Sequence, residues 1–184
     1  MRDLQLKMLE KQPKAYGGEL LKTRRGRSQG RPLDTRNSMH LVLRSSKATG
    51  RWSFRNPKNE RTVRNLSEKF AVKNGIKIYS LANVGNHLHF HIKLSNRFAY
   101  KRFIRGITAS IAMAVTGKSR WSSTDSATKL KFWDYRPFTR VVHGFKAFLN
   151  MRDYIRVNQL EGFGCQRREA RMVLTQRQFA EDSG

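Results

Sequence analysis

The chain has 184 residues, with 38 Lys and Arg against 13 Asp and Glu, and a net charge of +25. This length is enough for one domain with a substantial core. So large a positive excess destabilises a compact chain by self-repulsion unless a polyanion is bound, and nucleic acid is the polyanion that it favours. A membrane surface is the rival partner, but the charges are spread through a globular pattern and do not form one amphipathic helix.

The cysteine count and the apolar segments indicate in which cell compartment the protein is expected. Cys165 is the one cysteine, which excludes an internal disulfide framework. No apolar run is long enough to span a bilayer, and the first residues lack the apolar segment of a signal peptide. We therefore expect a cytoplasmic, nucleoid-associated protein without a membrane partner.

Residues 1–35 are expected to be a flexible basic extension. Cations alternate there with Gly, Ser and Gln, a composition that cannot bury a core. Two interpretations stay open, a solvated tail and an arm that binds phosphate groups. The cations that such an arm would use are Lys22, Arg24, Arg25, Arg27 and Arg31.

The remaining elements are taken in chain order. Short apolar runs predict strands at residues 39–44, 76–81 and 86–94, and a fourth, interrupted strand region at 132–142. Trp52 and Phe54 alternate and are interpreted as an edge segment. Apolar residues that recur every three or four positions predict helices at residues 59–74, 100–116 and 145–162, and a last polar helix near 170–174. The polar face of the second helix carries further candidate contacts to nucleic acid, Lys101, Arg102 and Arg105.

This order of elements indicates an α+β fold. Hairpin-connected strands mixed with crossover helices are typical of the ferredoxin-like, RRM-like arrangement, an antiparallel sheet with helices packed on one face. We expect a catalytic domain over residues 36–164, with its catalytic helix near the C-terminus. Residues 165–184 are expected to form a polar helix or tail.

Three of the five histidines alternate along one predicted strand, at His87, His89 and His91. Alternate residues of a strand share a face, so these imidazoles should point the same way and Leu88 and Phe90 should face the core. Neutral imidazoles held on a rigid strand can share a metal ion. No Asp or Glu occurs between Glu68 and Asp125, so any carboxylate ligand would come from far away in sequence. The alternative is that these histidines are structural, and His40 and His143 are interpreted as ordinary surface or core histidines.

Tyr154 and Asn158 are four residues apart on a predicted helix, which places them on one face. If that face meets the histidine strand, two imidazoles, an amide and a phenol surround a common point. Each residue also has a simpler interpretation, Tyr154 as a buried amphipathic residue and Asn158 as a solvated or capping one.

Two stretches resemble the signatures of a known family. Asn-His-Leu-His at 86–89 and the segment from Asp153 to Gly162 look like the two motifs of the single-tyrosine HUH (IS200-like) transposases, and within them of the REP-associated tyrosine transposases. The resemblance implies His87 and His89 as ligands of a divalent metal, Tyr154 as nucleophile and Asn158 as third ligand. The family usually has proline after that asparagine, whereas this chain has Gln159. His91 lies outside the family's histidine pair and is a possible accessory residue.

The resemblance also implies the reaction and the cofactor. The tyrosine would cleave and rejoin single-stranded or hairpin, REP-type DNA through a 5′-phosphotyrosine intermediate. Two imidazoles and an amide carry no charge, so the positive charge of the metal ion would be balanced only when a DNA phosphate binds. The ion should therefore bind weakly without DNA. Mg²⁺ or Mn²⁺ fits such a weak site better than Zn²⁺, which prefers more nitrogen and sulfur ligands.

Other functions remain open at this point. The chain could be a non-catalytic nucleic-acid-binding protein derived from such a transposase, and the Tyr154–Asn158 pair argues against this because a pure binder does not need it. A replication-initiator or relaxase-like nickase is disfavoured because the chain has no helicase segment. The sequence leaves monomer and homodimer undecided.

Overall fold

The computed structural model describes residues 31–118, 131–134 and 136–182. Within these residues, one antiparallel sheet has the strand order β2-β3-β1-β4. Its strands are β1 (Ser38–Arg44), β2 (Lys77–Asn83), β3 (His87–Lys93) and β4 (Phe138–Val142). The helices are a short 3₁₀ turn, η3 (Gly50–Trp52), and α2 (Pro57–Lys73), α3 (Arg97–Thr116), α4 (Gly144–Gly162) and α5 (Arg167–Asp182).

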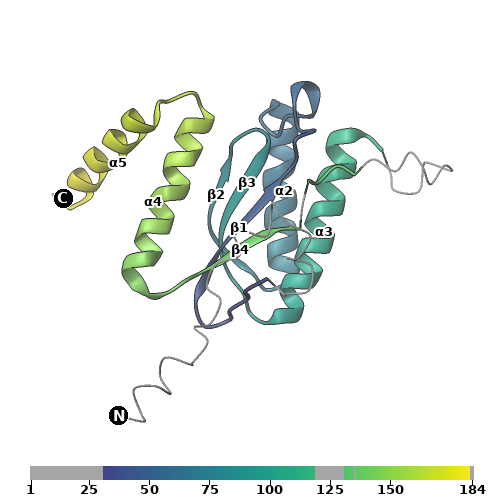
Figure 1. Ribbon diagram of the computed structural model, residues 1–184, viewed down its shortest axis with the longest axis horizontal. Helices are drawn as coiled ribbons and strands as arrows, with labels where there is room; N and C mark the ends of the chain where they lie inside the picture. Colours follow the sequence, from purple (N-terminus) through teal and green to yellow (C-terminus); the bar gives the residue numbers. More distant parts are fainter. Residues whose placement is uncertain (1–30, 119–130, 135, 183–184) are drawn as a thin grey trace, which may run out of the picture.

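The layers confirm the expected α+β class with an antiparallel sheet, but the helices pack on both faces of the sheet and not on one. Helices α2 and α3 lie side by side against one face of the sheet, and α4 lies against the other face (Figure 1). Helix α5 packs against α4 (Figure 1). Because α4 lies mainly over β2, no helix of the described residues covers the part of this second face formed by β1 and β4.

Strand alternation separates the core from the second face. In β3 the side chains of Leu88, Phe90 and Ile92 are fully buried in the core that α2 and α3 cover. The intervening histidines therefore point to the α4 side. Burial of large apolar side chains like these contributes about 1.5–3 kcal/mol each, which fixes the register and so the face that the histidines occupy.

Local signals explain where the two long helices of the core layer begin and end. The Asn56 side chain accepts a hydrogen bond from the backbone N–H of Lys58, and Pro57 occupies the first turn of α2. The Asn96 side chain caps α3 by accepting from the N–H of Ala99 at 2.8 Å. Gly117, with φ of 69°, ends α3 in the left-handed conformation that favours glycine.

The end of α4 is attached to the end of β2. The Gln159 side-chain oxygen accepts a hydrogen bond from the backbone N–H of Asn83 at 2.8 Å. A Cβ on Gly162 would lie 2.7 Å from the Asn83 carbonyl oxygen, so only glycine allows this close approach. Met151 and Ile155 bury the inner side of α4 in a small apolar cluster with Ala82. These contacts fix α4, and with it Tyr154, over the histidine face.

Two sequence expectations are wrong in the structure. Trp52 and Phe54 do not form an edge strand, because the chain makes a 3₁₀ turn there and Phe54 is buried in the core. Phe132 and Trp133 are not part of the fourth strand. They pack against Phe54, and the Trp133 indole N–H donates to the Thr108 carbonyl at 2.9 Å. In both segments, aromatic burial outweighs the tendency of alternating residues to extend a sheet.

The flexible extension expected over residues 1–35 lies outside the described residues up to residue 30. In the part of the chain that the structure does describe, no helix combines the length and the apolar character needed to cross a bilayer.

Candidate active site and nucleic-acid interface

A cavity of about 430 Å³ opens on the second face of the sheet, between α4 and the uncovered part of β1 and β4. Strands β1 and β3, the β4 region and helix α4 all contribute to its wall. The lining residues are His40, Val42, Arg44, His87, His89, Arg136, Phe138, Arg140, Met151 and Tyr154.

The sheet register brings these side chains together. Val42 of β1 lies between His89 of β3 and Phe138 of β4, and Arg44 pairs with His87. His40, two residues before Val42, pairs with Arg140 of β4. Directly opposed residues of an antiparallel pair share one face, so all of these side chains reach the same surface.

Tyr154 of α4 lies above the histidines. Its ring centroid is 5.6 Å from that of His40 and 5.8 Å from that of His89. The side chain is partly exposed, with 37% of its surface accessible. The phenol therefore faces a solvent-connected cavity and is not buried in the core.

The two histidines that were expected to bind a metal lie next to each other. The ring centroids of His87 and His89 are 4.8 Å apart. His87 Nδ1 lies 2.6 Å from the Asn86 side-chain oxygen, which can only accept, so Nδ1 carries the proton. The other nitrogen of His87, Nε2, is then left with its lone pair.

His89 is oriented by a third histidine, His40. His89 Nδ1 lies 3.0 Å from His40 Nε2, and the two ring planes are nearly parallel, with an interplanar angle of 6°. His89 Nε2 is buried and has no hydrogen-bond partner. If Nδ1 of His89 donates to His40, this orphaned Nε2 carries a lone pair, whereas the other tautomer would bury an N–H without an acceptor.

The electrostatic environment keeps these imidazoles neutral at pH 7. Burial lowers the pKa of His89 to about 3, with a further contribution from His40 and His87. Burial likewise lowers the pKa of His40 to about 4, and the charge of Arg140 adds to this effect. The pKa of His87 is lowered by burial and by Arg44. Neutral imidazole is the form that binds metals.

Asn158 does not join this group. It follows Tyr154 by one helical turn, as expected, but only 7% of it is exposed, and it is not among the residues that line the cavity. Its amide nitrogen donates to the Tyr154 backbone carbonyl at 2.6 Å. Within the described residues, no group of three His, Cys, Asp or Glu side chains could hold a metal ion. The described part of the chain therefore offers two neutral imidazoles side by side, His87 and His89, without a third ligand of these types.

His91 also lies away from the cavity. It is fully buried beneath α4, where its ring contacts Tyr79 and Phe148 and its Nε2 lies 2.8 Å from the Ser38 hydroxyl. This surrounding is that of a packed histidine, since aromatic rings cover it on two sides.

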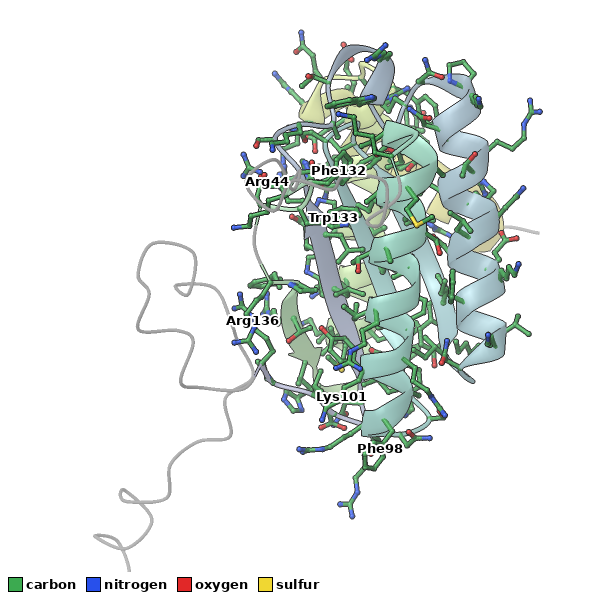
Figure 2. All side chains as sticks on the ribbon, turned by 90° about the vertical axis from the view of Figure 1, so that its right-hand side faces the viewer. Arg44, Phe98, Lys101, Phe132, Trp133 and Arg136 are labelled. Atoms are coloured by element: carbon green, nitrogen blue, oxygen red, sulfur yellow. The ribbon has the colours of Figure 1, made fainter. Side chains whose placement is uncertain are left out.

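The cations singled out from the sequence are distributed over three regions. Lys22, Arg24, Arg25 and Arg27 lie outside the described residues. Lys101, Arg102 and Arg105 are exposed on α3, on the side of the sheet opposite the cavity. The Arg31 guanidinium donates to the Arg136 carbonyl at 3.5 Å and also interacts electrostatically with Tyr100 of α3. Figure 2 shows Arg44 and Arg136 along one edge of the molecule and Lys101 at the lower end of α3.

Sequence reasoning missed His40 and three arginines of the cavity wall, Arg44, Arg136 and Arg140. His40 was interpreted as an ordinary histidine, yet it contacts both His89 and Tyr154. The alternation of β1 places His40 and Arg44 on one face, and this signal was available. What the sequence could not give is the pairing of β1 with β3 and β4, which turns that face toward the histidines.

The fold and the site define an α+β protein that carries paired histidines and arginines on a sheet, with a tyrosine on a helix above them. The chain belongs to the family of IS200-like transposases, whose model matches residues 35–158. It therefore has a transposase-like, DNA-binding role.

Solved structures similar to the chain include two transposases. A REP-associated tyrosine transposase bound to a REP hairpin is 14% identical, with a TM-score of 0.49, over 72% of this chain and 72% of that one. A candidate transposase from Deinococcus radiodurans is 14% identical, with a TM-score of 0.43, over 71% of this chain and 96% of that one. No curated protein sequence matches the chain.

Proposed function

We propose that the protein cleaves and rejoins single-stranded, hairpin or REP-type DNA through a covalent bond to Tyr154. The observation that supports this most is the cavity that holds Tyr154, His87 and His89 together. A phenol at the mouth of a cationic cavity next to metal-competent imidazoles is the set of groups that phosphoryl transfer to tyrosine requires.

In the proposed reaction, the Tyr154 oxygen attacks the phosphorus of a DNA phosphodiester. One bond forms between that oxygen and phosphorus, and the bond from phosphorus to the 3′ oxygen breaks. The 3′ oxygen leaves with a proton as a free hydroxyl, and the 5′ phosphate stays on the tyrosine. Since one phosphodiester replaces another, rejoining by the reverse attack of a 3′ hydroxyl needs no external energy source.

His87 and His89 would hold Mg²⁺ or Mn²⁺ through their Nε2 atoms. When bound, such an ion polarises a non-bridging phosphate oxygen. Asn158 would serve as third ligand only if its amide oxygen turned into the cavity, which the side chain does not line. Lys101, Arg102, Arg105 and the cations of the N-terminal extension are proposed as outer phosphate contacts, and we propose that the protein is nucleoid-associated.

The experiment is incubation of the protein with a labelled hairpin strand and Mg²⁺, followed by denaturing electrophoresis. We expect a protein–DNA adduct that Tyr154→Phe abolishes, because the ring remains but the attacking oxygen is gone. DNA affinity of Tyr154→Phe should match that of the parent protein. His89→Ala, or addition of EDTA, should abolish the adduct as well. An adduct formed at the same yield by Tyr154→Phe would exclude this assignment.

A second candidate function is a nucleic-acid-binding protein without catalysis. The position of Asn158 favours it, because this expected third metal ligand is buried and does not line the cavity that holds His87 and His89. Calorimetric titration of Mn²⁺ in the presence of a single-stranded oligonucleotide distinguishes the two functions. Binding that His87→Ala removes supports the enzyme, and absence of any binding supports the alternative.

A further inference from the structure

The cavity carries a marked excess of positive charge. Its wall includes three arginines and three histidines, and no acidic residue is among the described residues that line it. The neutral histidines leave the arginines as the source of charge. A cationic cavity of this kind concentrates anions.

The three arginines differ in how far the protein itself neutralises them. Arg44 has a partner, because its Nε lies 3.6 Å from a carboxylate oxygen of Asp134. Arg136 and Arg140 form no ion pair within the described residues. Both side chains belong to exposed residues, so their guanidinium groups are accessible from the cavity mouth.

A fourth arginine increases the local charge. Arg31 is directed to Arg136 by a hydrogen bond to its carbonyl. Burial lowers the pKa of the Arg31 guanidinium, and repulsion from Arg136 lowers it further. Arginines that lie close together are stabilised when an anion binds between them.

We propose that Arg136 and Arg140 form a phosphate-binding site that guides a single DNA strand across β1 and β4 to Tyr154. This inference rests on the proposed function and assigns a path for its substrate. The site faces the same cavity as Tyr154, whereas the α3 cations lie on the other side of the sheet. A guanidinium binds a phosphate through two parallel hydrogen bonds, and this contact does not depend on the base.

The test measures the affinity of a fluorescent single-stranded oligonucleotide by anisotropy at several salt concentrations. It uses Tyr154→Phe as the parent and includes EDTA, so that neither cleavage nor metal affects the result. The test variant carries Arg136→Gln and Arg140→Gln in addition to Tyr154→Phe. The matched control adds Arg61→Gln and Arg64→Gln, two exposed arginines of α2 with the same change of charge.

For single strands each neutralised phosphate contributes about 0.7 to the slope of log K against log salt, so removal of both guanidinium groups should lower the slope by about 1.4. At 0.1 M salt this corresponds to about 25-fold weaker binding. An oligonucleotide without bases should lose affinity by the same factor, because the arginines bind phosphate. The α2 control should bind like the parent, and circular dichroism should show all variants folded.

An affinity and slope equal to those of the parent would overturn the proposal, whether or not the wild-type protein forms an adduct. An equal loss of affinity in the α2 control would also overturn it, since net charge alone would then explain the effect. A loss confined to the oligonucleotide that carries bases would refute the phosphate assignment. The catalytic proposal can fail independently of this one. That outcome would be a wild-type protein that binds DNA through these arginines but forms no adduct.

Discussion

At the scale of single residues, the contact between His40 and His89 sets the geometry of the site. His89 is only 5% exposed, and its Nδ1 has His40 as its partner. A histidine that holds the ring of a metal-competent histidine fixes both its tautomer and its orientation. The residue that positions the site thus comes from β1, a strand that carries neither of the family's motifs.

His40→Leu tests this contact. The substitution keeps an apolar side chain of similar size but leaves a buried nitrogen of His89 without a partner, so the free energy of unfolding should fall by about 1–3 kcal/mol. His40→Gln, whose amide oxygen can accept from His89 Nδ1, should be destabilised less. Urea denaturation measures both, with the exposed His143→Ala as control. Equal stability of the two His40 variants would show that the hydrogen bond contributes nothing.

At the scale of elements, the position of α4 decides whether Tyr154 reaches the histidines. The helix is attached at its far end, where Gln159 accepts from Asn83 and Gly162 allows close approach. The family usually has proline at the position of Gln159. In this chain the glutamine replaces a turn-forming residue with a side-chain bond to β2.

Gln159→Ala should lower the free energy of unfolding by about 1–3 kcal/mol, because the Asn83 N–H loses its acceptor. Gln159→Glu keeps an acceptor oxygen and should retain most of the stability. The adduct yield at saturating DNA should fall in Gln159→Ala and recover in Gln159→Glu, because Tyr154 depends on the docking of α4. Full stability and full yield in the alanine variant would mean that α4 is held by its apolar contacts alone.

Much of the element order follows from local patterns. The alternation of Leu88 and Phe90 with the histidines fixes β3, and the glycine at 117 ends α3. The conformations of the aromatic segments 52–54 and 132–133 were not predicted, because Phe54 is buried by contact with Phe132 and Trp133, which are far away in sequence. The site was predictable where it lies within one element, as for His87 with His89. The parts of the site that depend on strand pairing, such as His40 and Arg140, could not be predicted from the sequence. The same holds for the side-chain conformation of Asn158.

At the scale of the whole molecule, positive charge extends well beyond the cavity. The tyrosine and histidines occupy one face of the sheet, whereas positive charge is spread over the chain, which carries 38 Lys and Arg. Phosphate-binding cations outside the cavity contribute affinity without taking part in the chemistry. The first described residue, Arg31, donates to the carbonyl of Arg136, and Arg136 lines the cavity.

Deletion of residues 1–30 should therefore weaken binding of a single-stranded oligonucleotide and lower the salt slope by about 0.7 for each phosphate that the extension neutralises. The adduct yield at saturating DNA should be largely preserved, because none of the proposed catalytic or metal-binding residues lies in the deleted segment. Anisotropy titrations at several salt concentrations give the slope. An unchanged slope would mean that the extension binds no phosphate.

The most direct test of the central claim is to locate the covalent bond between protein and DNA. The wild-type protein is incubated with a hairpin strand and Mg²⁺, digested with protease and nuclease, and analysed by mass spectrometry. We predict one modified peptide, with a nucleotide joined through its 5′ phosphate to Tyr154. A nucleotide joined to another of the chain's tyrosines, joined through its 3′ phosphate, or absent altogether would contradict the account.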